Sequence, residues 1–301
     1  MRPAGGSTTM LNALTFDVED YFHVHAFEGV IPRAQWDSIP TRVRESTRCI
    51  LELLREHDTR ATFFVLGWVA DRHPELVREI AADGHELASH GYAHEAVDSL
   101  TRERFRDDVA RSLEAIFAAC PDARIRGYRA PSFSINEKTT WAHDVLTEFD
   151  FAYDSSISPV TFHDRYGMPS ASRFVHAVGD QLTEIPVSTV RLLGCNWPVA
   201  GGGHFRLAPL ALTSWAVRRI NQERRPTVVY LHPWEFDPEQ PRVAAAPRRS
   251  RFRHYVNLRH TARRLRRLLE QFPFGPMEDV FGHEFRHDKA AAERVTLPAI
   301  P

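Results

Sequence analysis

The chain has 301 residues, which exceeds the usual size of one domain but falls within the length that a single α/β barrel fills. Its 43% hydrophobic and 26% charged residues are typical of a globular protein, and 38 basic against 39 acidic side chains leave a net charge of −1. This balance excludes an overall preference for polyanions or polycations, and we expect no nucleic-acid partner.

The cysteines and the N-terminal segment bear on location. Cys49, Cys120 and Cys195 are odd in number and widely spaced, which argues against a disulfide framework and against a thiolate zinc site. Residues 1–13 lack the apolar core of a signal peptide, and no stretch approaches 18 uninterrupted apolar residues. We therefore expect a cytoplasmic protein without a transmembrane segment.

Strand and helix signals alternate along most of the chain. Apolar residues recur at helical spacing in 40–56, and the nearly continuous apolar run 61–68 suits a buried parallel strand. Ser134 with Glu137 predicts a capping box that opens a helix through Thr147. The predicted strands are 13–18, 61–68, 86–89, 125–129, 151–154, 182–187 and 227–231, and further helices are predicted at 74–83, 101–119 and 210–222. This α/β pattern predicts a distorted (β/α) barrel with about seven parallel strands.

The C-terminal part has a different composition. Prolines space out a polar linker after His232, and a basic amphipathic helix is predicted over 254–271. Its arginine face is either solvated or meets anionic lipid or a polyanionic glycan, which would be a peripheral membrane contact. We therefore divide the chain into an N-terminal tail (1–12), a barrel (13–236), a helical extension packed on the barrel (237–285) and a C-terminal tail (286–301).

Two short stretches carry the residue types of a metal site. His90 and His94 follow a predicted strand at a spacing that places two imidazoles on one face of a helical turn. Asp17, Glu19 and Asp20 end the first strand at the same edge of the sheet, where three close carboxylates repel one another unless a cation lies between them. Zinc and similar ions commonly take two imidazoles and one carboxylate. A divalent-metal site with a spare carboxylate is expected, against the alternative of solvated or structurally bonded side chains.

Two other strand ends carry candidate catalytic groups. Arg129 could reach the spare carboxylate and hold it ionised, although arginines at strand ends are more often surface ion pairs. His232 ends the last strand and could act as a general acid or be bonded in the sheet rim. Trp197, Trp234 and the glycines 201–203 could form a platform for a sugar, although such tryptophans are often core residues.

These strand-end motifs, in this order, resemble the polysaccharide deacetylases of carbohydrate esterase family four, the nodulation-type deacetylase superfamily. The resemblance covers roughly Leu14 to Glu235. The Thr-Phe-Asp-Val-Glu-Asp opening at residue 15, the Trp-Glu-Phe-Asp stretch at 234 and the Phe-Arg-His-Tyr-Val-Asn-Leu stretch at 252 look like the exosortase-associated subgroup found with exopolysaccharide biosynthesis.

The resemblance implies a role for each matching residue. Asp17 would be the catalytic base, Arg129 its orienting partner and His232 the general acid. His90 and His94 would be metal ligands, and the metal with the backbone N–H of Ser132 would hold the oxyanion.

The sequence departs from the family pattern at two places. The commonest pattern has two adjacent aspartates in the first motif, whereas Val18 separates the acids here. We take Glu19 as the third metal ligand and Asp20 as the alternative. The residue that orients the acid histidine is not evident, and Asp154 and Glu184 are the candidates.

The resemblance thus implies a metal-dependent hydrolase that removes N-acetyl groups from acetamido sugars of a polysaccharide or its lipid-linked precursor, in exopolysaccharide biosynthesis. Zinc is the expected metal, with cobalt or nickel as alternatives. Two other functions stay open: hydrolysis of another non-peptide C–N bond, as in allantoinase-like or cyclic-imide hydrolases, and glycan binding by a barrel without turnover.

Overall fold

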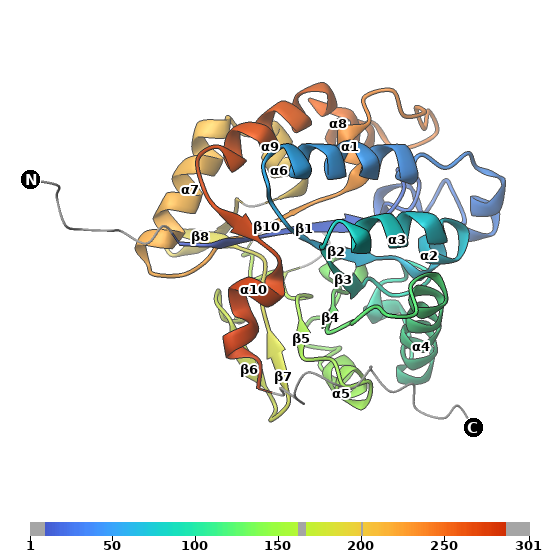
Figure 1. Ribbon diagram of the computed structural model, residues 1–301, viewed down its shortest axis with the longest axis horizontal. Coiled ribbons are helices and arrows are strands. Elements are labelled where there is room, and N and C mark those ends of the chain that lie inside the picture. The colour runs from blue at the N-terminus through green and yellow to red at the C-terminus, as the bar shows by residue number, and fades with distance from the viewer. Residues whose placement is uncertain (1–9, 162–166, 200, 287–301) are drawn as a thin grey trace, which may run out of the picture.

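The computed structural model describes residues 10–161, 167–199 and 201–286 (Figure 1). Within them, seven strands pair in parallel in the spatial order β10-β1-β2-β3-β4-β5-β7. They are β1 (Asn12–Val18), β2 (Thr62–Val65), β3 (Glu86–Ser89), β4 (Gly127–Tyr128), β5 (Tyr153–Asp154), β7 (Leu182–Glu184) and β10 (Val228–Leu231). The predicted fold class, an α/β barrel-like sheet of about seven parallel strands, is confirmed.

Four short strands complete the β-structure. The edge strand β6 (His176–Val178) runs antiparallel to β7, and β11 (Phe274–Gly275) pairs with the start of β1. A separate hairpin is formed by β8 (Thr189–Leu192) and β9 (Cys195–Pro198). In the pairing order β10 and β6 lie at opposite ends, so the described sheet is an open barrel.

Helices cover the outside of the sheet, and in Figure 1 α1 and α9 lie above β1 and β10. The helices are α1 (Val43–Glu56), α2 (Gly67–Arg72), α3 (Pro74–Ala82), α4 (Arg102–Ala119), α5 (Trp141–Glu148), α6 (Gly202–Leu207), α7 (Leu210–Gln222), α8 (Arg248–Tyr255), α9 (Thr261–Leu269) and α10 (Met277–Phe281). The helix predicted over 210–222 matches α7. The predicted N-cap of α4 is confirmed, since the Thr101 hydroxyl accepts from the backbone N–H of Arg104.

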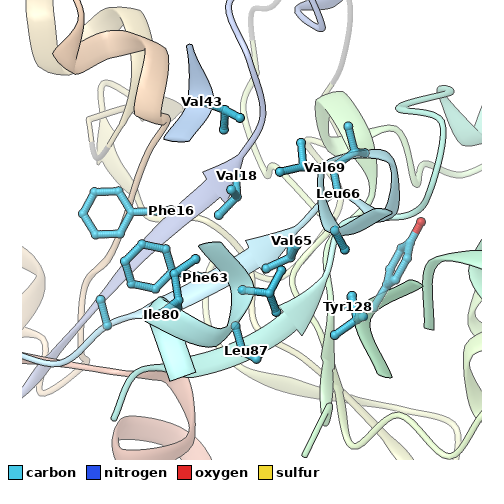
Figure 2. Close-up of a cluster of buried hydrophobic side chains, with 14 of the residues drawn as sticks. Phe16, Val18, Val43, Phe63, Val65, Leu66, Val69, Ile80, Leu87 and Tyr128 are labelled. Atoms are coloured by element: carbon cyan, nitrogen blue, oxygen red, sulfur yellow. The ribbon is translucent and has the colours of Figure 1, made fainter. Parts of the chain in front are cut away.

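The alternation of side chains along β1 determines which residues reach the barrel interior. Phe16 and Val18 point outward into the core beneath the helices, where Phe16 stacks on Phe63 with ring centroids 5.1 Å apart (Figure 2). Thr15 and Asp17, at the intervening positions, therefore point into the barrel. Burial of the apolar side chains fixes the register, because a slip by one residue would place Asp17 in the core.

Two predicted elements differ from the structure. The run 61–68 ends as a strand at Val65, and Gly67 begins α2 with its N–H donating to the carbonyl of Gly91. The predicted capping box at Ser134 is wrong: the Ser134 hydroxyl accepts from the backbone N–H of Val97, and the helix begins only at Trp141. Both errors arose because tertiary contacts outweighed a local signal.

The predicted basic helix over 254–271 is also wrong as one element. Asn257 adopts a left-handed backbone with φ of 56°, which ends α8 and separates it from α9. Leu265 and Leu268 of α9 are buried in the main core, while Arg264 donates to the carbonyls of Phe205 and Ala208. Of the predicted tails, residues 1–9 and 287–301 lie outside the described residues.

No helix in the described part of the chain is both long enough and apolar enough to cross a membrane.

Candidate metal centre and active site

The strand-end residues meet in one cavity of about 260 Å³ at the carboxyl edge of the sheet. Asp17 comes from β1, Glu19 follows it, His90 and His94 follow β3, and His232 follows β10. All five line the cavity, so the structure brings together residues up to 215 positions apart. Parallel strands place such residues side by side because their carboxyl ends share one edge.

Glu19, His90 and His94 form a group with metal-ligand geometry. One ligand atom from each lies within 4.8 Å of the others, and Nε2 of His94 is 2.6 Å from Oε2 of Glu19. Nδ1 of His90 is 2.8 Å from the carbonyl oxygen of Arg129, which leaves Nε2 as its available ligand atom. The donor set of two imidazoles and one carboxylate is one that zinc commonly takes.

The expected helical turn between the two histidines is absent from the described backbone. His94 instead has a left-handed conformation with φ of 50°. Asp108 of α4 accepts hydrogen bonds from the backbone N–H groups of Tyr92 and Ala93, at 2.8 and 2.9 Å, and Arg33 donates to the carbonyls of Ala93 and His94. The loop is therefore held from both sides, and these contacts place His94 beside His90.

The protonation of this group suits a cation. Burial raises the pKa of Glu19, but His94, His232 and His90 more than offset that effect, and the net pKa lies well below its ordinary value. Burial lowers the pKa of His90 to about 4, so that imidazole is neutral at physiological pH. Among the described residues, the buried Oε2 of Glu19 finds no hydrogen-bond partner of acceptable geometry, although His94 is near. A divalent ion would satisfy this atom.

The structure separates Glu19 from Asp20, the alternative third ligand. The Asp20 carboxylate turns away and accepts from the backbone N–H groups of Arg42 and Val43 at the start of α1, at 2.6 and 2.9 Å, and from that of Tyr21. Burial raises the pKa of Asp20 to about 6 against these hydrogen bonds. Asp20 therefore holds the helix start, and Glu19 is the acid that lies with the histidines.

Asp17 and Arg129 form a fully buried ion pair next to the metal group. Nη1 of Arg129 donates to Oδ1 of Asp17 at 2.6 Å and to the hydroxyl of Thr15 at 2.8 Å. The other side of the guanidinium donates to the carbonyl and hydroxyl oxygens of Ser155, and its centre lies 4.0 Å from the ring centroid of Phe64. These contacts fix the arginine, so Oδ2 of Asp17 remains directed at the cavity.

His232 lies beside Asp17 and Glu19 in the cavity. Its Nε2 is 3.8 Å from Oδ2 of Asp17 and 3.7 Å from Oε1 of Glu19. Burial lowers the pKa of His232, but a hydrogen bond to Glu235 and the charges of Glu19, Glu235 and Asp17 raise it to about 9. The imidazole is therefore protonated at neutral pH, as a general acid requires.

The partner that orients His232 is Glu235, which the sequence interpretation missed. Oε1 of Glu235 lies 2.8 Å from Nδ1 of His232 and also accepts from its backbone N–H. The proposed orienting residues, Asp154 and Glu184, are wrong for this role, because they lie together with His143 in a separate buried group. The spacing of Glu235 three positions after His232 was a signal for it, since this is the spacing of a capping box.

A buried arginine connects Glu235 to the C-terminal extension. Nε of Arg206, in α6, donates to Oε2 of Glu235 at 2.6 Å. Its remaining N–H groups donate to the carbonyls of Arg253, His254 and Val256 at 2.8 to 3.0 Å. No sequence signal marked Arg206, because its partners are backbone carbonyls that only the folded extension brings together.

The two tryptophans predicted as a sugar platform have different surroundings. Trp234 is only 7% exposed: its indole N–H donates to Oε1 of Glu19 at 3.0 Å, and its ring stacks on His254 with centroids 4.1 Å apart. Trp197 is 47% exposed on the β8–β9 hairpin and is not among the described residues that line the cavity. The platform prediction is therefore wrong for Trp197. Trp234 lines the cavity, and its indole N–H holds the Glu19 carboxylate.

Smaller groups complete the cavity. Ser132 has a left-handed backbone with φ of 56° and lines the cavity beside Phe133. Gly202 and Gly203 begin α6 at the opposite side, so part of the predicted glycine loop does reach the site. A Cβ atom on Gly201 would come within 2.3 Å of the Tyr230 ring, which explains the need for glycine there.

Comparison with known proteins gives two family matches along the chain. Residues 28–149 match the family model described as polysaccharide deacetylase, and residues 155–282 match a domain of unknown function, DUF3473. A chitooligosaccharide deacetylase of Sinorhizobium fredii is 40% identical over 98 residues, which are 33% of this chain and 43% of the relative. Another from a Bradyrhizobium species is 38% identical over 149 residues, covering 50% of this chain and 64% of the relative.

Solved structures share the fold. A candidate polysaccharide deacetylase from Mycobacterium smegmatis superposes with a TM-score of 0.60 at 24% identity, covering 100% of this chain and 98% of that one. The matches to the two curated relatives span less than two thirds of their length. The structural likeness therefore supports the fold, and the sequence likeness supports the family of the N-terminal half.

Proposed function

We propose that this chain is a metal-dependent N-deacetylase of the polysaccharide deacetylase family, whose model matches its residues 28–149. Its substrate would be an acetamido sugar within a polysaccharide or its lipid-linked precursor. The relatives named above are chitooligosaccharide deacetylases, which supports an N-acetylated sugar as the substrate class.

One observation carries this proposal: a His-His-carboxylate group, a second carboxylate paired with a buried arginine, and His232, whose pKa its acidic neighbours raise, line one cavity. Hydrolysis of an amide needs a base for water, a site for the developing negative charge and an acid for the leaving amine. The cavity supplies a separate group for each of these requirements.

Glu19, His90 and His94 would hold the metal, most simply zinc, with cobalt or nickel as alternatives. When bound, a divalent ion supplies Lewis acidity toward the acetamide carbonyl and the hydrolytic water. The fit rests on the partnerless Oε2 of Glu19 and on the His90 tautomer that its hydrogen bond to Arg129 sets.

The remaining steps fall to the chain's own residues. Asp17 accepts the proton of the attacking water, and Arg129 orients that carboxylate through its hydrogen bond to Oδ1. The backbone N–H of Ser132 donates to the oxygen on which negative charge develops. His232 then gives its Nε2 proton to the sugar nitrogen as the C–N bond breaks, which yields acetate and a free amino sugar.

The test is acetate release from chitooligosaccharides and from a synthetic acetyl ester, with the chain loaded with zinc, cobalt or nickel. We expect Asp17→Asn to abolish turnover with folding intact, and Asp98→Asn, at an exposed carboxylate, to leave it unchanged. Undiminished turnover in Asp17→Asn would contradict the mechanism. Ring opening of allantoin or a small imide without acetate release would instead identify a different C–N hydrolase, and metal-independent glycan binding without turnover would identify a binding barrel.

The cellular role is a further part of the proposal. The motif resemblance to the exosortase-associated subgroup supports a step in exopolysaccharide biosynthesis, and the three cysteines, all free, are compatible with a cytoplasmic location. Deletion of the gene should leave the exopolysaccharide with more N-acetyl groups, measured by NMR of the purified polymer. Cell fractionation tests the location and any peripheral membrane contact of the basic helices.

A further inference from the structure

A second group of metal-ligand residues lies apart from the active site, at the carboxyl ends of β5 and β7. It consists of His143 from α5, Asp154 at the end of β5 and Glu184 at the end of β7. The elements α5, β5 and β7 lie in the same part of the ribbon in Figure 1. One ligand atom from each lies within 4.8 Å of the others. Asp154 and Glu184 are fully buried and His143 is 7% exposed.

Each member has one buried atom without a hydrogen-bond partner in the described part of the chain. These atoms are Nε2 of His143, Oδ2 of Asp154 and Oε2 of Glu184. The other oxygen of each carboxylate is satisfied: the Ser156 hydroxyl donates to Oδ1 of Asp154, and the backbone N–H of Ile157 donates to Oε1 of Glu184. The hydrogen bonds to these oxygens fix both carboxylates. The partnerless atoms of all three residues therefore lie close to one another.

The separations fit ligands of a common ion better than direct hydrogen bonds. Nε2 of His143 lies 3.3 Å from Oδ2 of Asp154, yet the two atoms do not form a hydrogen bond of acceptable geometry. In a tetrahedral zinc site with bonds of about 2.0–2.2 Å, two ligand atoms are about 3.4 Å apart. The observed distance of 3.3 Å is close to that separation.

Charge gives a second argument. Asp154 and Glu184 are both fully buried, and two buried carboxylates side by side cannot both be ionised without a counter-charge. A single shared proton can bridge only two of the three partnerless atoms. A divalent cation contacts all three and neutralises both carboxylates.

We propose that His143, Asp154 and Glu184 bind a second divalent cation, with a structural role and a preference for nitrogen and oxygen ligands, as zinc or manganese has. This site would join α5, β5 and β7. It would also fix Ser155, which follows Asp154. The carbonyl and hydroxyl oxygens of Ser155 accept hydrogen bonds from Arg129. The proposal does not depend on the deacetylase activity.

Metal content tests the proposal directly. We would measure zinc, manganese, iron and calcium by mass spectrometry in the full chain as purified and after loading with zinc or manganese. We expect two equivalents of metal in the wild type and one in His143→Asn and in Glu184→Gln. Glu19→Gln with His94→Ala should also leave one equivalent, that of the second site. His85→Asn is the matched control, since Nε2 of His85 is likewise buried and partnerless among the described residues but has no carboxylate pair.

One equivalent in the wild type that His143→Asn and Glu184→Gln leave unchanged would overturn the proposal and would show a shared proton instead. If these variants fail to fold, anomalous diffraction from wild-type crystals decides. A peak within bonding distance of Nε2 of His143 and both carboxylates supports the second site. A peak confined to Glu19, His90 and His94 contradicts it.

Discussion

The indole N–H of Trp234 donates to Oε1 of Glu19 at 3.0 Å, and this hydrogen bond joins the last parallel strand to the first across the candidate metal centre. It leaves Oε2 of Glu19 directed at His94. Groups that hydrogen-bond to the non-coordinating atom of a metal ligand fix its orientation, and their loss commonly weakens metal affinity by about 10- to 100-fold.

We therefore predict that Trp234→Phe weakens zinc binding by about 10- to 100-fold, because the ring remains while the donor is lost. The measurement is competition with a chromophoric chelator. Trp197→Phe, on the exposed hairpin, serves as the control and should bind zinc like the wild type. Equal zinc affinity in the wild type and both variants would show that the hydrogen bond from Trp234 to Glu19 does not contribute to zinc binding.

A second prediction concerns Glu235, which holds Nδ1 of His232 at 2.8 Å. Glu235→Gln removes the negative charge that keeps His232 protonated and oriented, so we expect kcat to fall by about 10²- to 10⁴-fold, the range of general acid catalysis. KM should change much less, because Glu235 is fully buried and His232 lies between it and the acidic residues of the cavity. Steady-state kinetics on a chitooligosaccharide measure both constants.

Two controls sharpen the second prediction. Glu52→Gln, at an exposed position of α1, should leave kcat unchanged. Glu184→Gln tests the orienting residue expected from sequence, and its kcat is compared with that of Glu235→Gln because Glu184 also belongs to the proposed second cation site. A loss of kcat in Glu184→Gln with normal kcat in Glu235→Gln would contradict the present assignment.

The contrast between Glu235 and the other site residues shows how far the sequence predicted the site. Asp17, His90, Arg129 and His232 could be placed in one cavity because each lies at or just after the end of a buried strand, and parallel strands end at one edge. The preference for Glu19 over Asp20 came from the family resemblance and could not be derived from the residues alone. The choice depends on the N–H groups of Arg42 and Val43, which attract the Asp20 carboxylate only once α1 has packed.

The C-terminal half was harder to predict for a similar reason. The basic pattern over 254–271 is continuous in sequence, but the left-handed Asn257 divides it, and the carbonyls just before that residue are the ones that bind Arg206. The extension thus reaches the active site through its backbone. Periodicity of side chains carries no information about such contacts.

A third prediction follows for Arg206, which is 1% exposed and pairs with the fully buried Glu235. Arg206→Gln leaves the buried Glu235 carboxylate without one of its two positive partners and three carbonyls without a full set of donors. We expect the free energy of unfolding to fall by about 3–5 kcal/mol, as when one partner of a buried ion pair is removed. Urea unfolding followed by tryptophan fluorescence measures this change.

Arg218→Gln is the matched control for the third prediction, since its guanidinium bonds to Gln271 at the exposed surface. We expect its unfolding free energy to change by less than about 0.5 kcal/mol. If Arg206→Gln were as stable as Arg218→Gln, the contacts of Arg206 with residues 253–256 would not contribute to the packing of the extension.

The fourth prediction is a pH dependence of stability that arises at His85. This residue directly precedes β3 and lies away from the metal centre. Nδ1 of His85 accepts from the backbone N–H of Ala61 at 3.2 Å, and its ring packs against Phe63. Burial, opposed by Asp83 and aided by Arg55 and Arg60, lowers the pKa of His85 to about 4. Its ordinary value in an unfolded chain is about 6.5.

The direction in which stability changes with pH follows from proton binding to His85 in the folded and unfolded chain. Between pH 6.5 and 4 the unfolded chain holds more protons at this residue than the folded chain, so the stability conferred by neutral His85 is complete above pH 6.5 and falls as the pH drops toward 4. The slope is at most about 1.4 kcal/mol per pH unit.

His85→Asn keeps an acceptor near Nδ1 but does not titrate, so the wild type should lose stability relative to this variant on acidification. Urea unfolding at pH 7, 6 and 5, with His283→Asn as an exposed control, measures the difference. Parallel stability curves for the wild type and His85→Asn would contradict the prediction, because they would mean that His85 binds protons equally in both states.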